Sequence, residues 1–433
     1  METEQFTIAV IGSGFVGVTA AVVLADMGHQ VTCSDRDPDR VESLRECIAP
    51  FYEPGLTEIL TKAISSGNLK VTTSNVEAVA GAKIVFLCLP TPAGLNDEPD
   101  MSAVRSVVAE LESIWEPGTI VVTKSTAPIG WGKELTERLK PRGVFVVSNP
   151  EFLSEGNAIR DFRFPDRVLI GSYSPEAAQV LATLHKPLNA PIIVTDCTSA
   201  ELGKYVANSY LATRLSYFNE VAALCKVTEA DITSVLASVG LDARIGPSFM
   251  KPGPGWGGSC LPKDTLAFTA FARSAGKPLS LVEVARTAND TQLDRCLRII
   301  IETMQEFDLG PRLAQWGLAF KAGTDDVRYS PALTIADHLR DRGIPIQVFD
   351  PKVNGSSHGH TTSATALESC QGARLLVVAT EWPQFNEIDP TEVAASGITH
   401  VIDFRNILDM DKWAAAGIHY QGLGRSIPAS DQI

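Results

Sequence analysis

Short apolar runs alternate with helix-like segments over the first 198 residues of the chain. The runs lie at residues 6–11, 30–34, 83–89, 119–123, 144–148, 168–170 and 192–195. Strands that alternate with helical patterns are typical of a mostly parallel sheet with helices on both faces. This part of the sequence therefore predicts an α/β domain.

The pattern takes a helical period between residues 199 and 309. Residues 200–226 form one long amphipathic pattern, and shorter helical patterns follow at 229–238, 265–274 and 281–306. Beyond Gly310 and Pro311 the alternation returns, with strand-like runs at 313–320, 345–349, 375–379 and 400–402. We therefore expect two Rossmann-like α/β domains, at residues 1–198 and 310–433, joined by an α-helical middle domain at 199–309 that contains a long helix.

Composition narrows the classes of partner. The 433 residues carry a net charge of −14, which argues against nucleic acid and anionic membrane surfaces as partners. No apolar run approaches the roughly 20 residues that a membrane span needs, and the first residues are acidic where a signal peptide would be basic. We expect a cytoplasmic protein. The eight cysteines include no C-x-x-C pair, so the spacing indicates no metal site.

A glycine fingerprint follows the first apolar run. Gly12, Gly14 and Gly17 form the pattern G-x-G-x-x-G, and the next predicted strand ends at Asp35. The glycines permit a tight turn and a close approach to a pyrophosphate, and an acid at this place accepts from a ribose 2′-hydroxyl. The motif therefore predicts an NAD site. Arg36 leaves NADP open, because an arginine there can meet a 2′-phosphate, although the adjacent carboxylate would repel one.

Cys260 is the candidate nucleophile. A glycine-rich run precedes it, and Lys263 and Asp264 follow it. Glycines let the backbone come close to a ligand, and a nearby ammonium favours the thiolate. If a helix begins at Leu261, its dipole favours the thiolate as well.

Two further pairs of polar residues lie where they could take part in catalysis. Lys204 and Asn208 are four residues apart on the predicted long helix, so one helix face presents an ammonium and an amide suited to an oxyanion. A solvated helix face is the commoner use of such a pair. Glu151 and Glu155 follow a predicted strand, where ligands of open α/β sheets bind. Proton transfer and a solvated loop fit these two acids equally well.

The last predicted domain offers basic groups on an otherwise acidic protein. Lys321 and Arg328 follow its first strand, where they can clamp a diphosphate. Its second strand ends at Asp350, much as the second strand of the chain ends at Asp35. These basic groups suit a nucleotide-linked substrate.

Taken in order, these pieces resemble the UDP-glucose and GDP-mannose dehydrogenase family over nearly the whole chain. The resemblance rests on the glycine fingerprint, on the Cys260 segment and on short motifs at residues 52–56, 91–92, 125–126, 149–156, 165–167, 201–205, 244–247, 320–321, 324–328 and 380–382. It implies the oxidation of a sugar primary alcohol to a carboxylate in two hydride transfers to NAD. It also implies a homodimer formed through the long helix from Ala200.

The resemblance further implies a role for each matching residue. Cys260 attacks the aldehyde formed first, and the thiohemiacetal is oxidised to a thioester that water hydrolyses. In the family pattern Lys204 and Asn208 stabilise the oxyanions, Asp264 with Thr126 positions the water, and Glu151 assists proton transfer. The implied cofactor contacts are Gly12, Gly14, Phe15, Val16, Gly17, Asp35, Arg40, Thr91, Pro92, Ser125, Thr126, Glu155, Lys263 and Arg328. The implied substrate contacts are Glu151, Phe152, Leu153, Glu155, Lys204, Asn208, Phe249, Lys251, Gly255, Gly257, Cys260, Lys321 and Arg405, with Arg244 reaching a neighbouring subunit's sugar.

Departures from the family pattern bear on the substrate. Ser154, Trp256 and Phe404 differ from the residues common in relatives, which leaves the nucleotide base open. Residues 317–326 resemble GDP-mannose enzymes, whereas residues 244–247 and 380–382 favour glucose. We expect UDP-glucose, with dTDP-glucose, GDP-mannose or a UDP-N-acetylhexosamine as alternatives. The rival classes are a simple two-electron dehydrogenase, which would not need Cys260, and a nucleotide sensor that binds NAD without reducing it.

Overall fold

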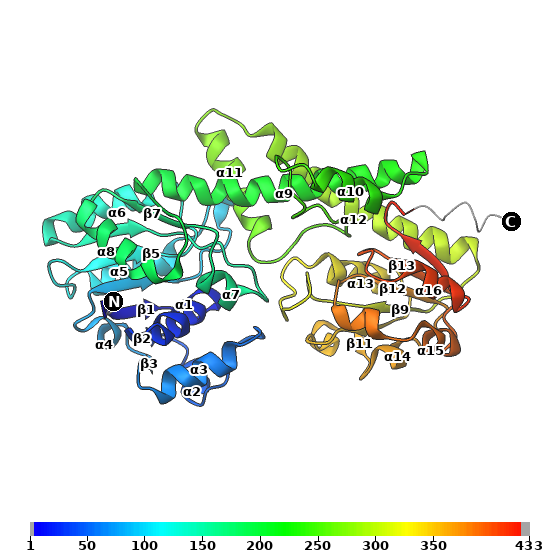
Figure 1. The fold of residues 1–433 in the computed structure, drawn as a ribbon, viewed down its shortest axis with the longest axis horizontal. Helices are drawn as coiled ribbons and strands as arrows, with labels where there is room; N and C mark the ends of the chain where they lie inside the picture. Colours follow the sequence, from blue (N-terminus) through cyan, green and yellow to red (C-terminus); the bar gives the residue numbers. More distant parts are fainter. Residues whose placement is uncertain (1–3, 426–433) are drawn as a thin grey trace. The chain divides into compact units, whose positions relative to one another are not determined.

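The computed structural model describes residues 4–425, which fold into two compact units (Figure 1). The first unit contains the chain up to Ala207 together with Leu266–Gly276, and the second contains Asn208–Thr265 and the chain from Lys277 onward. Each unit holds one Rossmann-like sheet. The α/β fold class with a helical middle region is therefore confirmed. The expected boundaries at residues 198 and 309 stay predictions.

The sheet of the first unit has eight strands in the order β3-β2-β1-β4-β5-β6-β7-β8. All neighbours pair in parallel except β6 and β7, which are antiparallel. Strand β3 was not expected, because its sequence Leu69-Lys70-Val71-Thr72 contains no apolar run. The strands are β1 (Thr7–Ile11), β2 (Gln30–Ser34), β3 (Leu69–Thr72), β4 (Ile84–Leu87), β5 (Ile120–Thr123), β6 (Phe145–Ser148), β7 (Val168–Ser172) and β8 (Ile192–Thr195).

Helices cover this sheet, and the first of them is buried on every side. Helix α1 (Phe15–Asp26) is buried from residue 17 to residue 25, because it lies against strands β1 to β3 and helices α3 and α7. An all-round apolar surface is what such a central helix requires. The other helices of the unit are α2 (Pro38–Arg45), α3 (Leu56–Ser65), α4 (Asn75–Val79), α5 (Ser102–Leu111), α6 (Trp131–Leu139), α7 (Ala158–Arg163) and α8 (Pro175–His185).

Four helices follow β8 in the sequence. The long green helix in Figure 1 is α9 (Cys197–Thr228), and the boundary between the two units falls within it. The next helix, α10 (Ile232–Gly240), starts later than residue 229, because Glu229 has φ +59° and the Asp231 side chain accepts from the amides of Thr233 and Ser234 at the true N-terminus. Helix α11 (Leu261–Ser274) begins directly after Cys260, and α12 (Ser280–Glu306) ends this helical stretch.

The sheet of the second unit is parallel throughout, in the order β11-β10-β9-β12-β13-β14. Its central strand β9 is buried on both faces, as parallel sheets covered by helices require. Strands β11 and β14 were not expected from the sequence. The elements are β9 (Leu313–Trp316), α13 (Pro331–Asp341), β10 (Ile346–Phe349), β11 (Thr361–Thr362), α14 (Ala366–Ser369), β12 (Leu375–Val378), α15 (Pro390–Ala395), β13 (His400–Asp403), α16 (Met410–Ala415) and β14 (His419–Gly422).

Within residues 4–425, no helix combines the length and the apolar character that crossing a bilayer requires.

Candidate active site

The glycine fingerprint forms the turn between β1 and α1, and each glycine has its own steric reason. Gly12 has φ +97°, and a Cβ there would lie 2.7 Å from the carbonyl oxygen of Cys88. A Cβ on Gly17 would lie 1.9 Å from the carbonyl oxygen of Gly12. A Cβ on Gly14 would meet nothing within 4 Å, so the space at the N-terminus of α1 is open. The turn is therefore tight on one side and open for a pyrophosphate on the other.

Asp35 follows β2 and lies beside the glycine turn. Its Oδ2 accepts from the amide of Ser13 at 2.8 Å and from the Ser13 hydroxyl at 2.7 Å, and its Oδ1 accepts from the amide of Asp37 at 3.0 Å. Burial opposes ionisation, but these hydrogen bonds and the charge of Arg40 outweigh it and hold the pKa of Asp35 below its usual range. A charged carboxylate thus stands where a ribose hydroxyl would need an acceptor.

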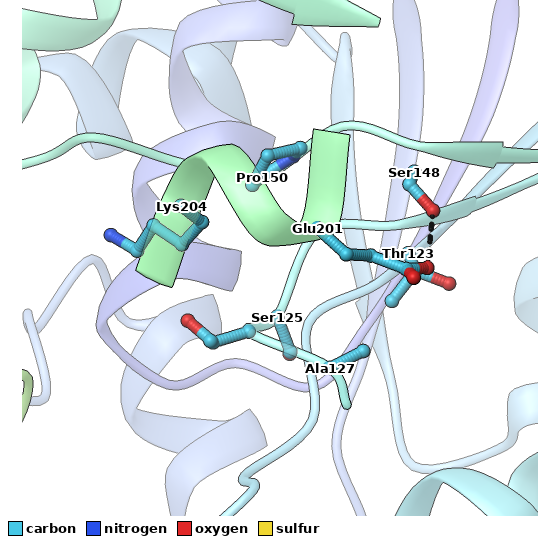
Figure 2. Close-up of a pocket in the computed structure, with 8 residues that line it drawn as sticks. Thr123, Ser125, Ala127, Ser148, Pro150, Glu201 and Lys204 are labelled. Carbon is cyan, nitrogen blue, oxygen red and sulfur yellow. Dashed lines mark hydrogen bonds between the residues drawn. The ribbon is translucent and has the colours of Figure 1, made fainter. Parts of the chain in front are cut away.

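The loops after β4 and β5 are tied to one another. The Thr91 hydroxyl donates to the carbonyl oxygen of Thr126 at 2.9 Å, and the Ser125 hydroxyl donates to that of Leu89 at 2.6 Å. The loop after β5 lines a small pocket in the first unit (Figure 2). The pocket is lined by Thr123, Ser125, Thr126, Ala127, Ser148, Pro150, Glu201 and Lys204.

Glu151 and Lys204 form a buried ion pair. The Lys204 ammonium donates to Glu151 Oε1 at 2.9 Å, and their side chains are 3% and 6% exposed. Glu151 Oε2 accepts from the amide of Leu153 at 2.5 Å. The Phe152 ring lies beside two cations, with the Arg167 guanidinium carbon 3.5 Å and the Lys204 nitrogen 5.3 Å from its centroid. The solvated-loop interpretation of Glu151 is therefore wrong, and Glu155 is buried too.

Burial alone would raise the pKa of Glu151. The charge of Lys204, its hydrogen bond, the amide of Leu153 and the charge of Lys124 act in the opposite direction and hold that pKa below its usual range. Glu151 is therefore an ionised acceptor inside the protein.

Three buried residues of the first unit were not identified from the sequence as site residues. Lys124 is 6% exposed and donates to Asn149 Oδ1 at 2.9 Å. Glu201 accepts from the amides of Gly130 and Gly132, both at 2.7 Å, and from Ser148 at 2.8 Å. In Figure 2 the Glu201 side chain extends toward Ser148, whereas that of Lys204 extends the other way.

The third such residue is Glu53. Its carboxylate accepts from the amides of Gly156 at 2.6 Å and Ala158 at 2.7 Å, which satisfies free amides at the start of α7. The loop that carries Glu151 is thereby fixed at its far end.

In the second unit, Cys260 stands immediately before α11. Its carbonyl oxygen accepts from the amide of Asp264 at 3.0 Å, in the first turn of that helix, and its sulfur lies 3.6 Å from the Ser259 hydroxyl. The thiol is partly exposed, whereas most of the other cysteines are buried. The predicted helix N-terminus behind Cys260 is confirmed, and its free amides favour an anion there.

Asp264 is 1% exposed and holds two donors at once. Its Oδ2 accepts from the Asn208 amide at 2.6 Å, and its Oδ1 pairs with the Lys263 ammonium at 2.5 Å. Lys204 and Asn208, one turn apart on α9, therefore have different carboxylate partners, Glu151 and Asp264. Their convergence on one ligand atom stays a prediction.

The glycine run before Cys260 packs against loops of the C-terminal sheet. A Cβ on Gly257 would lie 2.0 Å from the carbonyl oxygen of Tyr329, and one on Gly253 would lie 2.6 Å from an Arg405 nitrogen. Arg405 itself donates to the carbonyl oxygens of Ala379 at 3.0 Å and Phe320 at 3.1 Å. The structure thus brings the Cys260 loop together with Arg405 and with the segment that carries Lys321 and Arg328.

Helices α9 and α12 fix the same run by hydrogen bonds. Asn219 accepts from the amide of Gly253 at 2.9 Å, and Asn289 accepts from that of Trp256 at 2.7 Å. The Trp256 indole donates to Ser216 at 2.9 Å. The backbone before the nucleophile is therefore held on several sides.

Other predicted substrate residues lie at the surface. Arg244 has an 88% exposed side chain that pairs with Asp242, Phe249 is 45% exposed with φ +56°, and Lys251 is exposed.

Asp350 follows β10 as Asp35 follows β2, but its carboxylate accepts more hydrogen bonds from the protein. Its Oδ2 accepts from the amides of Leu318 and Ala319 and from the Trp382 indole, and its Oδ1 accepts from the amides of Lys352 and Val353.

Comparisons with known proteins agree along the whole chain. The models of the UDP-glucose/GDP-mannose dehydrogenase family match residues 6–189 (NAD binding domain), 198–291 (central domain) and 314–410 (UDP binding domain). The UDP-glucose 6-dehydrogenase of Pseudomonas aeruginosa is 37% identical over an alignment of 440 positions, which covers 96% of this chain and 97% of that protein.

Two solved structures extend this similarity. A UDP-glucose dehydrogenase from Pyrobaculum islandicum shares 33% identity with a TM-score of 0.89 and covers 98% of each chain. A UDP-D-ManNAc dehydrogenase from Pyrococcus horikoshii shares 26% identity with a TM-score of 0.86, covering 98% of this chain and 100% of the other.

Proposed function

Because this chain belongs to the UDP-glucose/GDP-mannose dehydrogenase family, we propose that it oxidises the C6 hydroxyl of UDP-glucose to a carboxylate, giving UDP-glucuronate. The enzyme is an NAD-dependent oxidoreductase. The observation that carries the proposal is the partly exposed Cys260 at the N-terminus of α11, at the end of a glycine run held by α9 and α12. A two-electron dehydrogenase has no use for such a thiol.

The first unit fits the cofactor. The open space at Gly14 and the free amides of α1 suit a pyrophosphate, and the ionised Asp35 suits a ribose hydroxyl. The other contacts proposed in this unit are Phe15, Val16, Arg40, Thr91, Pro92, Ser125, Thr126 and Glu155. Lys263 and Arg328, which belong to the second unit, are proposed contacts as well. NAD, when bound, supplies a hydride acceptor for each oxidation.

The covalent steps run through Cys260. In the first oxidation a hydride leaves C6 and a proton leaves its hydroxyl oxygen, which gives an aldehyde. The Cys260 sulfur adds to the aldehyde carbon, and loss of a second hydride and of the hydroxyl proton converts the thiohemiacetal to a thioester. Water then cleaves the C–S bond, so that one water is consumed and the acid and the free thiol are released.

The buried polar residues stabilise these steps. Lys204 and Asn208 carry the donors proposed for the oxyanions, because each is buried and held by a carboxylate. Asp264, with Thr126, is proposed to position the water. Glu151 is proposed to accept the water's proton, because it is ionised inside the protein.

The substrate side is proposed to lie along the Cys260 loop. Arg405 and Lys321 provide cations for the diphosphate on a chain of net charge −14. The further contacts proposed are Glu151, Phe152, Leu153, Glu155, Phe249, Lys251, Gly255 and Gly257. Arg244 is proposed to reach the sugar of a second copy, because its guanidinium is exposed in this chain.

A second copy is proposed to pack on α9. Leu202, Val206, Tyr210, Tyr217 and Leu224 are 39–61% exposed, and their spacings of four and seven place them along one helix stripe. A Tyr210→Asp/Tyr217→Asp variant should therefore sediment as a monomer. The control variant Val76→Asp alters an exposed valine of α4 and should remain a dimer. A wild type that sediments as a monomer would contradict the proposal.

A panel of nucleotide sugars tests the substrate. The purified protein is mixed with NAD and with UDP-glucose, dTDP-glucose, GDP-mannose or a UDP-N-acetylhexosamine, and NADH is followed by absorbance. We expect UDP-glucose to react best, with about two NADH formed per sugar acid. A preference for another sugar would overturn the substrate, and the Pyrococcus relative makes UDP-N-acetylmannosamine the first alternative. One NADH per sugar would identify a simple dehydrogenase, and none would identify a sensor.

A further inference from the structure

Lys124 occupies an unusual place for a lysine. Its side chain is 6% exposed, and its ammonium donates to the neutral Asn149 Oδ1 at 2.9 Å. Among the described residues, no carboxylate lies within ion-pair distance of that ammonium. Burying an ammonium without a direct counter-ion costs stability, and an apolar side chain of similar volume would cost less. A residue retained at such a cost points to a functional role.

Lys124 belongs to a buried group of three charges in the first unit. The other two are Glu151 and Lys204, whose ion pair measures 2.9 Å. Lys124 and Lys204 both lower the pKa of Glu151, so two cations act on one carboxylate. Of these two cations, Lys204 is the one hydrogen-bonded to Glu151.

The groups that face Lys124 come from four other segments. Glu151 follows β6, Lys204 lies on α9, Cys88 follows β4, and His185 ends α8. Burial lowers the pKa of Lys124 to about 8, although Cys88 and Glu151 act to raise it and Lys204 lowers it further. Burial, with help from the charge of Lys124, lowers the pKa of His185 to about 4, so that this imidazole is neutral at neutral pH.

The proposed chemistry requires Glu151 to remain ionised even when Lys204 no longer donates to it. When Lys204 turns its donor to a substrate oxyanion, Glu151 loses the cation that is hydrogen-bonded to it. A buried carboxylate without a cation takes up a proton and can no longer accept one from water. Lys124 is tethered to Asn149, so its charge stays in place during that exchange.

We propose that Lys124 is a positioning residue: it is the fixed counter-cation that keeps Glu151 ionised while Lys204 serves the substrate. This inference rests on the proposed function. It adds a residue outside the predicted catalytic set, and it predicts that Lys124 acts on the protonation of Glu151 rather than on substrate binding.

Three substitutions separate charge from packing. Lys124→Met removes the charge and the donor, Lys124→Gln removes the charge and keeps a donor for Asn149, and Lys124→Arg keeps the charge. The control is Lys83→Met, because Lys83 is an exposed lysine of the same unit that donates to the carbonyl oxygen of Gly118 at 2.8 Å. For each protein, kcat with UDP-glucose is measured from about pH 4 to about pH 10, with both KM values and Tm.

The wild type is measured first, so failure of the proposed function is seen before any variant is compared. For Lys124→Met and Lys124→Gln we expect the acid limb of the kcat profile to move up by about one pH unit, since the pKa of Glu151 rises. Both KM values should stay within about twofold, and Tm should not fall. Lys124→Arg should keep the wild-type acid limb, and Lys83→Met should match the wild type.

Two results would overturn the inference while leaving the proposed function intact. One is that Lys124→Met and Lys124→Gln differ from the wild type only in the height of the kcat profile, with the acid limb at the wild-type pH. The other is a uniform loss of kcat together with a lower Tm, because that combination identifies a merely structural lysine.

Discussion

Replacing Asp35 by asparagine tests the cofactor side of the site most directly. The side chain keeps its shape and one oxygen, but it loses the negative charge that three hydrogen bonds and Arg40 now stabilise. A hydrogen bond to a charged group contributes about 1.5–3 kcal/mol. Losing that contribution to a ribose hydroxyl should raise the KM for NAD about 10- to 150-fold.

The same substitution should also weaken discrimination against NADP. Arg40 lies 3.8 Å from the Asp35 carboxylate, and Arg36 is its neighbour in sequence. Without the carboxylate these cations can meet a 2′-phosphate that is now repelled. We therefore expect kcat/KM to fall with NAD and to rise with NADP in the Asp35→Asn variant.

Ser13→Ala is the matched control. It removes the 2.7 Å hydrogen bond to Asp35 but leaves the charge, so the KM for NAD should rise only about 2- to 13-fold, as for the loss of about 0.5–1.5 kcal/mol. The assay is initial-rate NADH or NADPH formation at saturating UDP-glucose. Equal effects of the two substitutions, or a KM for NAD within about twofold of wild type in Asp35→Asn, would refute the assigned role.

Two further substitutions test the Cys260 loop. Cys260→Ser should form NADH in a first turnover and then stall, because an alkoxide ester or adduct is released slowly; steady turnover at the wild-type rate would exclude the covalent route. Gly257→Ala should lower Tm and raise the KM for UDP-glucose, because its Cβ would lie 2.0 Å from a backbone oxygen and overpacking costs about 1–3 kcal/mol. Gly203→Ala, inside α9 and 3.3 Å from a flexible Leu169 methyl, should instead leave Tm unchanged or raise it, and similar losses in both variants would contradict the steric argument.

The sequence predicted most strands and helices because long apolar runs have clear periods. The strands that it did not reveal, β3, β11 and β14, have two to four residues each. Each of them contains polar residues and no apolar run, unlike predicted strands of four residues such as β4 and β12. Each pairs with the edge of a neighbouring strand, and that information lies elsewhere in the chain.

The site was predictable where a local motif carries it. Gly12, Asp35 and Cys260 are recognised from their immediate neighbours. Glu53 and Glu201 are not, because their hydrogen-bond partners lie 103–105 and 53–71 residues away in the sequence. A single carboxylate that caps a distant loop has no local signal, so only the folded chain reveals it.

Asp35 and Asp350 follow equivalent strands of the two sheets, but the glycine turns beside them differ. Gly317 and Ala319 follow β9 as Gly12 and Gly14 follow β1, but the amide of Ala319 is already bound to Asp350, and Ala319 is fully buried. No helix begins at this turn, since the next α-helix, α13, starts only at Pro331, so the free amides that bind a pyrophosphate are missing. The second sheet therefore lacks a dinucleotide site. We infer that the two hydride transfers proposed for each sugar use the single site at Asp35 in turn, with NADH leaving while the sugar stays attached to Cys260.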